Sequence, residues 1–105
     1  MQLPEEIKKN PEIDVPIGGI RGWKVGGPEG LVVFFEIQPG AVLPEHCHCF
    51  QWGIVIDGSI ELTIGGETKT YNKGDTYMMP EGTPHSGLIP NGCLAMDYFA
   101  DPTRY

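Results

Sequence analysis

Apolar and polar residues alternate along much of this chain, in short runs separated by glycine and proline. The clearest run covers residues 59–64, where Ile60, Leu62 and Ile64 share one face and polar residues share the other. A period of two residues is typical of a strand with one buried face. Gly65-Gly66 follows this run and predicts a tight hairpin into a second strand over residues 68–71.

Further stretches are predicted to be strands because they are rich in β-branched or aromatic residues and are bounded by turn residues. They cover residues 31–38, 52–57, 76–80, 85–89 and 93–99. Pro39-Gly40 and Asp57-Gly58 are interpreted as turns after the first two. One helix is expected over Pro4–Asn10, where two Glu precede two Lys. Short strands at regular spacing indicate an all-β fold, an antiparallel sandwich or barrel.

The chain has 105 residues, which is enough for one domain with one core. Residues 1–30 are expected to form an N-terminal arm and the first strands, and residues 31–105 the barrel core of the same domain. The chain has fourteen acidic and seven basic residues, which gives a net charge of −7, and no basic cluster is present. Nucleic acid and anionic membranes are therefore poor candidate partners, because both bind through basic patches.

The N-terminal residues lack the pattern of a secretory signal, and no apolar run approaches membrane-spanning length. A cytoplasmic location is the resulting expectation. Cys47, Cys49 and Cys93 are an odd number of cysteines, which favours free thiols over a disulfide framework.

All three histidines fall in two short segments, 40–58 and 74–85. His46 and His48 are two residues apart, so on a strand both imidazoles would project from one face. His85 would come from another strand after a reversal at Gly82. Gln51 would offer its amide oxygen as a fourth ligand. We therefore predict a site for one divalent metal ion, and because imidazole suits several metals the ligands do not name the ion.

These segments resemble the two motifs of the cupin superfamily. The first runs from Gly40 through His46 and His48 to Gly58, and the second from Gly74 to His85. The resemblance implies a cupin-type double-stranded β-barrel, or jelly roll, with His46, His48 and His85 as metal ligands and Gln51 in the position of an acidic ligand. Three departures stand out: a shortened gap before the acid position, Gln in place of Glu, and Ile89 in place of a final Asn.

Glutamine in place of glutamate changes the expected chemistry of the metal. Three neutral imidazoles and an amide leave the full divalent charge on the ion, which makes it a stronger Lewis acid and a better anion trap. The two-His, one-carboxylate set of many non-haem Fe(II) oxygenases is missing. The missing carboxylate makes a dioxygenase the less favoured hypothesis. It stays open, because three-His iron cupins exist as a class.

The C-terminal residues 97–105 resemble the ending of small cupins similar to those that linearise unsaturated uronates in pectin degradation, which also carry Gln at the acid position. By this resemblance Asp97 would be a catalytic acid/base. Phe99 would shape the substrate pocket, and Arg104 would pair with a substrate carboxylate and assist catalysis. Alternation places Asp97 between Ala95 and Phe99, so its pKa is raised if this face is interior. An outward-facing Asp97 is the alternative.

The favoured function is a metal-dependent isomerase or lyase that acts on a sugar acid or another small carboxylate, with Zn, Ni, Mn or Fe as the cofactor. A non-haem iron dioxygenase and a non-catalytic small-molecule-binding cupin are the alternatives, so whether the chain is an enzyme stays open. A homodimer is expected, because adjacent Phe34 and Phe35 face opposite sides of a strand and one of them would be exposed on a monomer.

Overall fold

Eight strands and one short 3-10 helix make up the computed structural model, which describes residues 1–105. In chain order they are η1 (Ile7–Lys9), β1 (Ile20–Gly27), β2 (Gly30–Ile37), β3 (Ala41–His46), β4 (Gln51–Ile64), β5 (Glu67–Asn72), β6 (Thr76–Met79), β7 (His85–Ile89) and β8 (Cys93–Phe99). All strand pairs are antiparallel. The result is a single-domain, all-β barrel.

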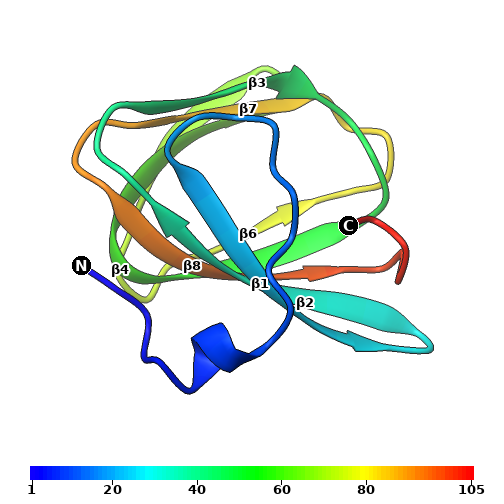
Figure 1. Ribbon diagram of the computed structural model, residues 1–105. Helices are drawn as coiled ribbons and strands as arrows, with labels where there is room; N and C mark the ends of the chain where they lie inside the picture. The colour runs from blue at the N-terminus through cyan, green and yellow to red at the C-terminus, as the bar shows by residue number, and fades with distance from the viewer.

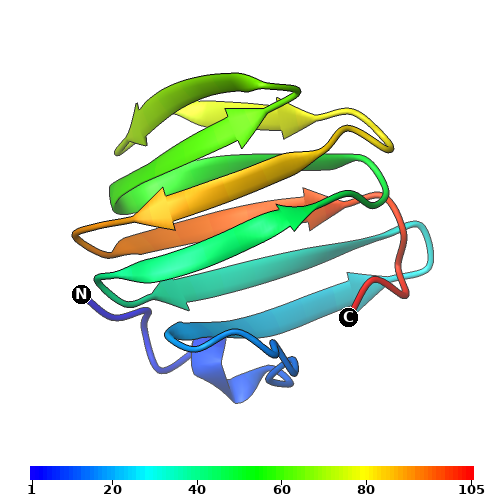
Figure 2. The same ribbon diagram turned by 90° about the horizontal axis from the view of Figure 1, so that it is seen from above.

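The strands form a sheet that curls into two layers, in the order β1-β2-β8-β4-β7-β3, with β5 and β6 also paired to β4 (Figure 1). One layer contains β1, β2, β8 and β6, and the other contains β3, β7 and β5. Figure 2, turned by 90°, shows the strands running roughly alongside one another. The barrel interior lies between the two layers.

Strand β4 belongs to both layers, and this corrects one prediction. Asp57-Gly58 was expected to be a turn between two strands, but β4 is continuous over 14 residues. Its pairing with β8 shifts register between Val55 and Asp57, and Gly58 adopts a φ of 76°. A bulge and a left-handed glycine therefore bend one strand from the first layer into the second.

Most other predicted elements lie close to their expected bounds. Strands β7 and β8 have exactly the predicted residues. The hairpin at Gly65-Gly66 is confirmed, with φ values of 57° and 84° and Ile64 paired with Glu67. The predicted helix is reduced to η1, because Asn10 precedes a proline and is already extended.

The core consists of two main clusters of apolar side chains between the layers. The larger contains Val55, Ile60, Leu62, Tyr77, Met79, Ile89, Cys93, Ala41 and Ala95. The second contains Ile13, Leu31, Val33, Phe35 and Phe99. Phe35 is thus buried inside, while Phe34 is only partly buried on the opposite face, as strand alternation requires.

The structure also bears on the predictions about cysteines and membrane-spanning segments. Cys47, Cys49 and Cys93 are all free. Burial raises the pKa of the Cys93 thiol to about 12, which makes it an inert core residue. No helix in the structure has the length and apolar character needed to span a membrane.

Candidate metal centre

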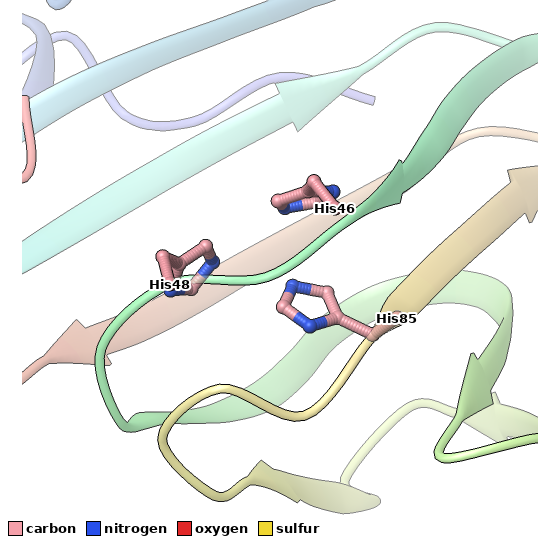
Figure 3. A group of neighbouring side chains, drawn as sticks. All are labelled: His46, His48 and His85. Atoms are coloured by element: carbon pink, nitrogen blue, oxygen red, sulfur yellow. The ribbon is translucent and has the colours of Figure 1, made fainter.

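The three histidines meet at one end of the barrel. His46 is the last residue of β3 and pairs with His85, the first residue of β7. His48 lies in the loop between β3 and β4, so its orientation comes from that loop and not from strand alternation as predicted. One ligand atom from each histidine lies within 4.8 Å of the others (Figure 3). This is the arrangement that a single metal ion requires.

Backbone carbonyls hold all three imidazoles in the same tautomer. The Nδ1 atoms of His46, His48 and His85 donate to backbone oxygens at 2.9, 2.9 and 3.0 Å. The acceptors are Pro44, Cys49 and Thr83. With the proton on Nδ1, each Nε2 keeps its lone pair for a metal, and this outer shell of hydrogen bonds orients the rings.

His85 provides the test of whether a metal fits. Its side chain is buried, with 2% of the residue exposed, and Nε2 has no hydrogen-bond partner. A buried acceptor without a partner costs free energy, so such atoms are rare. A metal ion bound to Nε2 would satisfy it, and the residues present therefore fit a metal.

The protonation states of the histidines also suit metal binding. Burial lowers the pKa of His48 to about 4 and also lowers the pKa of His85. Both rings are therefore neutral at pH 7, the form that ligates a metal. Little free energy is needed to displace protons from them.

Gln51, the predicted fourth ligand, begins β4 and is buried on the cavity side of the sheet. Its amide nitrogen donates to Oδ2 of Asp97 at 2.6 Å. Because a carboxylate only accepts hydrogen bonds, Asp97 holds the amide nitrogen toward itself and leaves Oε1 as the atom available to a metal. Coordination by Gln51 stays a prediction.

Asp97 faces the interior, with only 2% of the residue exposed, so the outward-facing alternative is wrong. The hydroxyl of Tyr77 donates to both of its carboxyl oxygens at 2.9 Å. Burial raises the pKa of Asp97 to about 7, against the opposing effect of the hydrogen bonds from Gln51 and Tyr77. Burial and the neighbouring Asp97 charge likewise raise the pKa of Tyr77. Asp97 is thus poised to exchange a proton near neutral pH.

Sequence reasoning missed Tyr77. Alternation in residues 76–80 places Tyr77 on the same face as Met79, and this was the available signal. The contact with Asp97 depends on the pairing of β6 and β8 with opposite edges of β4, where Gly53 pairs with both Tyr77 and Asp97. That three-strand register is a tertiary feature.

Gly53 leaves the space in which Tyr77 and Asp97 meet, and replacing it by alanine is expected to disrupt that contact. A Cβ at position 53 would lie 2.5 Å from Asp97 Oδ2 and would also overlap the Tyr77 ring. We expect Gly53→Ala to lower the free energy of unfolding by about 1–3 kcal/mol, measured by urea denaturation. Gly26→Ala is the matched control, because its Cβ would be 3.6 Å from Leu31. Equal stability of the two variants would contradict the expectation.

His46, His48, Gln51 and Asp97 line one cavity of about 460 Å³, and His85 lies beside the first two. This volume suits a small-molecule ligand. Most of the other lining residues are apolar, Phe99 among them, and residues 14–17 also line it. In Figure 1 the segment that contains them extends from the lower layer to the upper one.

The C-terminal residues bring a cation to the same cavity. Arg104 lines the cavity, and its Nε is buried without a hydrogen-bond partner. Its guanidinium lies 4.4 Å from the centre of the Tyr105 ring. Tyr105 is in turn held by edge contacts with Phe35 and Phe99 and by Lys24, which donates to its backbone oxygen at 3.1 Å. The structure thus brings together every predicted site residue.

Comparisons with known proteins agree with this architecture. A family model described as "Cupin domain" matches residues 33–90, more than half of the chain. This chain belongs to the cupin family. An RmlC-like cupin from Shewanella frigidimarina NCIMB 400 is similar to it, with 25% identity, a TM-score of 0.82 and coverage of 92% of this chain and 87% of that one.

Two other relatives bear on the site. The structure of KdgF from Halomonas sp. matches this cupin with 28% identity and a TM-score of 0.80 over 92% of this chain and 90% of that one. Quercetin 2,3-dioxygenase from Bacillus subtilis (strain 168) is 37% identical over 57 residues. That match spans 52% of this cupin but only 17% of the dioxygenase.

Proposed function

We propose that this cupin is a metal-dependent enzyme that isomerises or opens a small carboxylate-bearing molecule, with sugar acids such as unsaturated uronates as the first class to examine. The observation that carries the proposal is that a cluster of three oriented imidazoles, two of which line the cavity, meets a buried carboxyl group with a pKa near neutrality and an arginine at the same cavity. A Lewis acid, a proton-transfer group and an anion anchor are the parts that such a reaction needs.

Each residue has a distinct role in this proposal. His46, His48, His85 and Gln51 would hold one divalent ion of Zn, Ni, Mn or Fe, which supplies polarisation of a substrate carbonyl or hydroxyl when bound. The guanidinium of Arg104 pairs with the substrate carboxylate and fixes its orientation. A carboxyl oxygen of Asp97 accepts a proton from one atom of the substrate and returns it to another atom of the substrate. Such a transfer shifts a double bond or opens a ring.

The similarity of the C-terminal residues to uronate-linearising cupins supports sugar acids as substrates. Phe99 forms part of the cavity wall beside His48, with ring centres 5.5 Å apart, and would exclude water from the reacting atoms. The proposal also keeps a cytoplasmic location, which stays a prediction of the sequence.

A non-haem iron dioxygenase is the second candidate, favoured by the 37% identity to quercetin 2,3-dioxygenase over 57 residues. It requires iron and consumption of oxygen together with substrate. A non-catalytic cupin that binds small molecules would hold a metal or metabolite without turnover.

The deciding experiment is an activity assay with an unsaturated uronate on protein loaded separately with Zn, Ni, Mn or Fe. Loss of the ultraviolet absorbance of the conjugated double bond reports ring opening, and an oxygen electrode reports dioxygenase activity. We expect loss of absorbance without oxygen uptake. Oxygen uptake with the iron-loaded protein would favour the dioxygenase instead, and no turnover with any metal or carboxylate would overturn the enzymatic proposal.

Replacing Arg104 tests the anion anchor separately. We expect Arg104→Gln to raise KM for a carboxylate substrate about 10- to 100-fold, because a charge-assisted hydrogen-bonded pair contributes about 1.5–3 kcal/mol. Metal content should be unchanged. Lys73→Gln, a change at an exposed cation that is not among the cavity residues, is the matched control. An unaltered KM in Arg104→Gln would remove Arg104 from substrate binding.

A further inference from the structure

The cavity beside the metal centre has a polar end and an apolar end, which the register of the strands keeps apart. His46 and His85 pair where β3 ends and β7 begins (Figure 3). Phe99 ends β8 at the same end of the barrel, with its ring centre 5.5 Å from that of His48. Asp97 lies two residues before Phe99 on the same face of β8. The histidines and Asp97 therefore gather at one end.

Further from the histidines, the layer that contains β3 and β7 presents leucines to the cavity. Leu43 and Leu62 lie on either side of Gly87, and both pair with it in register. A Cβ on Gly87 would lie 3.2 Å from Leu62 and 3.6 Å from Leu43. Because both leucines line the cavity, they supply its wall at the level where the glycine has no side chain.

The opposite layer is apolar as well. Ala95 precedes Asp97 on the inner face of β8 and pairs with Phe35, and Cys93 pairs with Ile37. The strand from Asp97 to Cys93 is about 13 Å long. This length accommodates a six-membered ring or a short branched chain beyond the polar end. The apolar residues that line this inner part include Ile20, Ile37, Leu43, Ile60, Leu62 and Ala95.

The inner part has few groups able to pair with a hydroxyl group of a ligand. No serine, threonine, asparagine or lysine lines the cavity. Tyr77 and Gln51 line it, but the Tyr77 hydroxyl and the Gln51 amide nitrogen both donate to Asp97. Asp14 and Glu45 line it as exposed residues. Burying a hydroxyl group without a partner is unfavourable, so a fully hydroxylated ligand would bind weakly.

Arg104 gives the cavity an anchor for an anion. It is the one lysine or arginine among the lining residues, and its buried Nε has no hydrogen-bond partner. We propose that the cavity selects carboxylates with an apolar body. Arg104 holds the carboxylate, and an aliphatic or aromatic group lies in the inner part between Leu62 and Ile37. Such a ligand satisfies the cation and leaves no hydroxyl group unpaired among the apolar side chains.

This inference rests on the proposed function for the carboxylate, and it narrows the class of substrate from small carboxylates in general to those with few hydroxyl groups. Among sugar acids, an unsaturated uronate has lost a hydroxyl group to its double bond and therefore fits the inner part better than a saturated one. An acid whose ring carries no hydroxyl group fits best, because burial of its apolar surface adds to the affinity.

Two acids of similar size test this preference. Cyclohexanecarboxylate and glucuronate each carry one carboxylate on a six-membered ring, but only glucuronate has hydroxyl groups. NMR titration of the isotope-labelled full chain, loaded with zinc, measures the affinity for each acid. We expect a dissociation constant of about 1 mM for cyclohexanecarboxylate, the order for a ligand of this size, and at least about tenfold weaker binding of glucuronate.

Variants locate the bound acid. Leu43→Asn places an amide of similar size on the cavity wall and should weaken binding of cyclohexanecarboxylate at least about fivefold. Val42→Asn is the matched control, because Val42 is 53% exposed on the opposite face of β3. If Leu43→Asn does not fold, as judged by circular dichroism, Val15→Thr decides, because it adds a hydroxyl group to the cavity wall at nearly unchanged volume. Arg104→Gln should weaken binding of both acids.

Glucuronate that binds as tightly as cyclohexanecarboxylate, no binding of either acid, or equal weakening in Val42→Asn and Leu43→Asn would each overturn the inference. Because the titration does not measure turnover, this inference and the proposed function fail separately. Protein that prefers cyclohexanecarboxylate but converts no carboxylate would overturn the proposed function alone. Protein that opens uronates but prefers glucuronate would overturn this inference alone.

Discussion

Replacing His85 by alanine is expected to remove stoichiometric metal from this cupin. His85 contributes the one imidazole whose Nε2 is buried without a partner, and alanine supplies no ligand atom in its place. Changes in the outer shell of a metal site already cost 10- to 100-fold in affinity, so loss of a direct ligand should cost at least about 100-fold. Plasma mass spectrometry on protein purified without chelator gives the stoichiometry, and competition with a fluorescent chelator gives the affinity.

Two controls separate ligand loss from a general effect on this end of the barrel. Cys47 lies between His46 and His48 but is exposed, and Cys49 Sγ is 3.9 Å from His48 Nδ1. Cys47→Ser and Cys49→Ser should both keep the metal, because the predicted ligand atoms are the histidine Nε2 atoms and not the thiols. Metal that is retained in His85→Ala, or lost in a cysteine variant, would contradict the three-histidine centre.

Replacing Asp97 by asparagine is expected to have the second large effect, a loss of turnover by about 10²- to 10⁴-fold, the usual contribution of a proton-transfer group. Asparagine keeps the size of the side chain but cannot take a proton. Steady-state rates on metal-loaded protein measure this. Tyr77→Phe retains the carboxylate and removes one donor to it, so its loss should be smaller. Full activity in Asp97→Asn would remove Asp97 from the chemistry.

The same variant should become relatively more stable as the pH rises. Burial raises the folded-state pKa of Asp97 to about 7 from 3.8. Below about pH 4 both states hold the proton; between pH 4 and 7 only the unfolded state releases it, so metal-free wild type loses up to about 4 kcal/mol from this group. Asparagine does not titrate. The Tm of metal-free Asp97→Asn should therefore gain on that of wild type between pH 4 and 7 in calorimetry, and a constant difference would contradict this.

Local sequence patterns were sufficient for the elements with short-range causes. Two successive glycines specify the Gly65-Gly66 hairpin because both residues need positive φ. The bounds of β7 and β8 follow from turn residues on either side. Asp57-Gly58 misled for a related reason: the same left-handed glycine that closes a turn can also bend a continuous strand. Only the presence of partners on both sides of β4 decides between the two.

The sequence by itself determined the cupin architecture and the three histidines, because their spacing is a property of the chain. The tertiary structure decided what surrounds them. It placed His48 by a loop, turned each Nδ1 to a backbone oxygen, and brought Tyr77 and Asp97 together across Gly53. It also showed Asp97 to be interior. Such contacts join residues from strands distant in sequence, and their distances and burial arise only when the barrel closes.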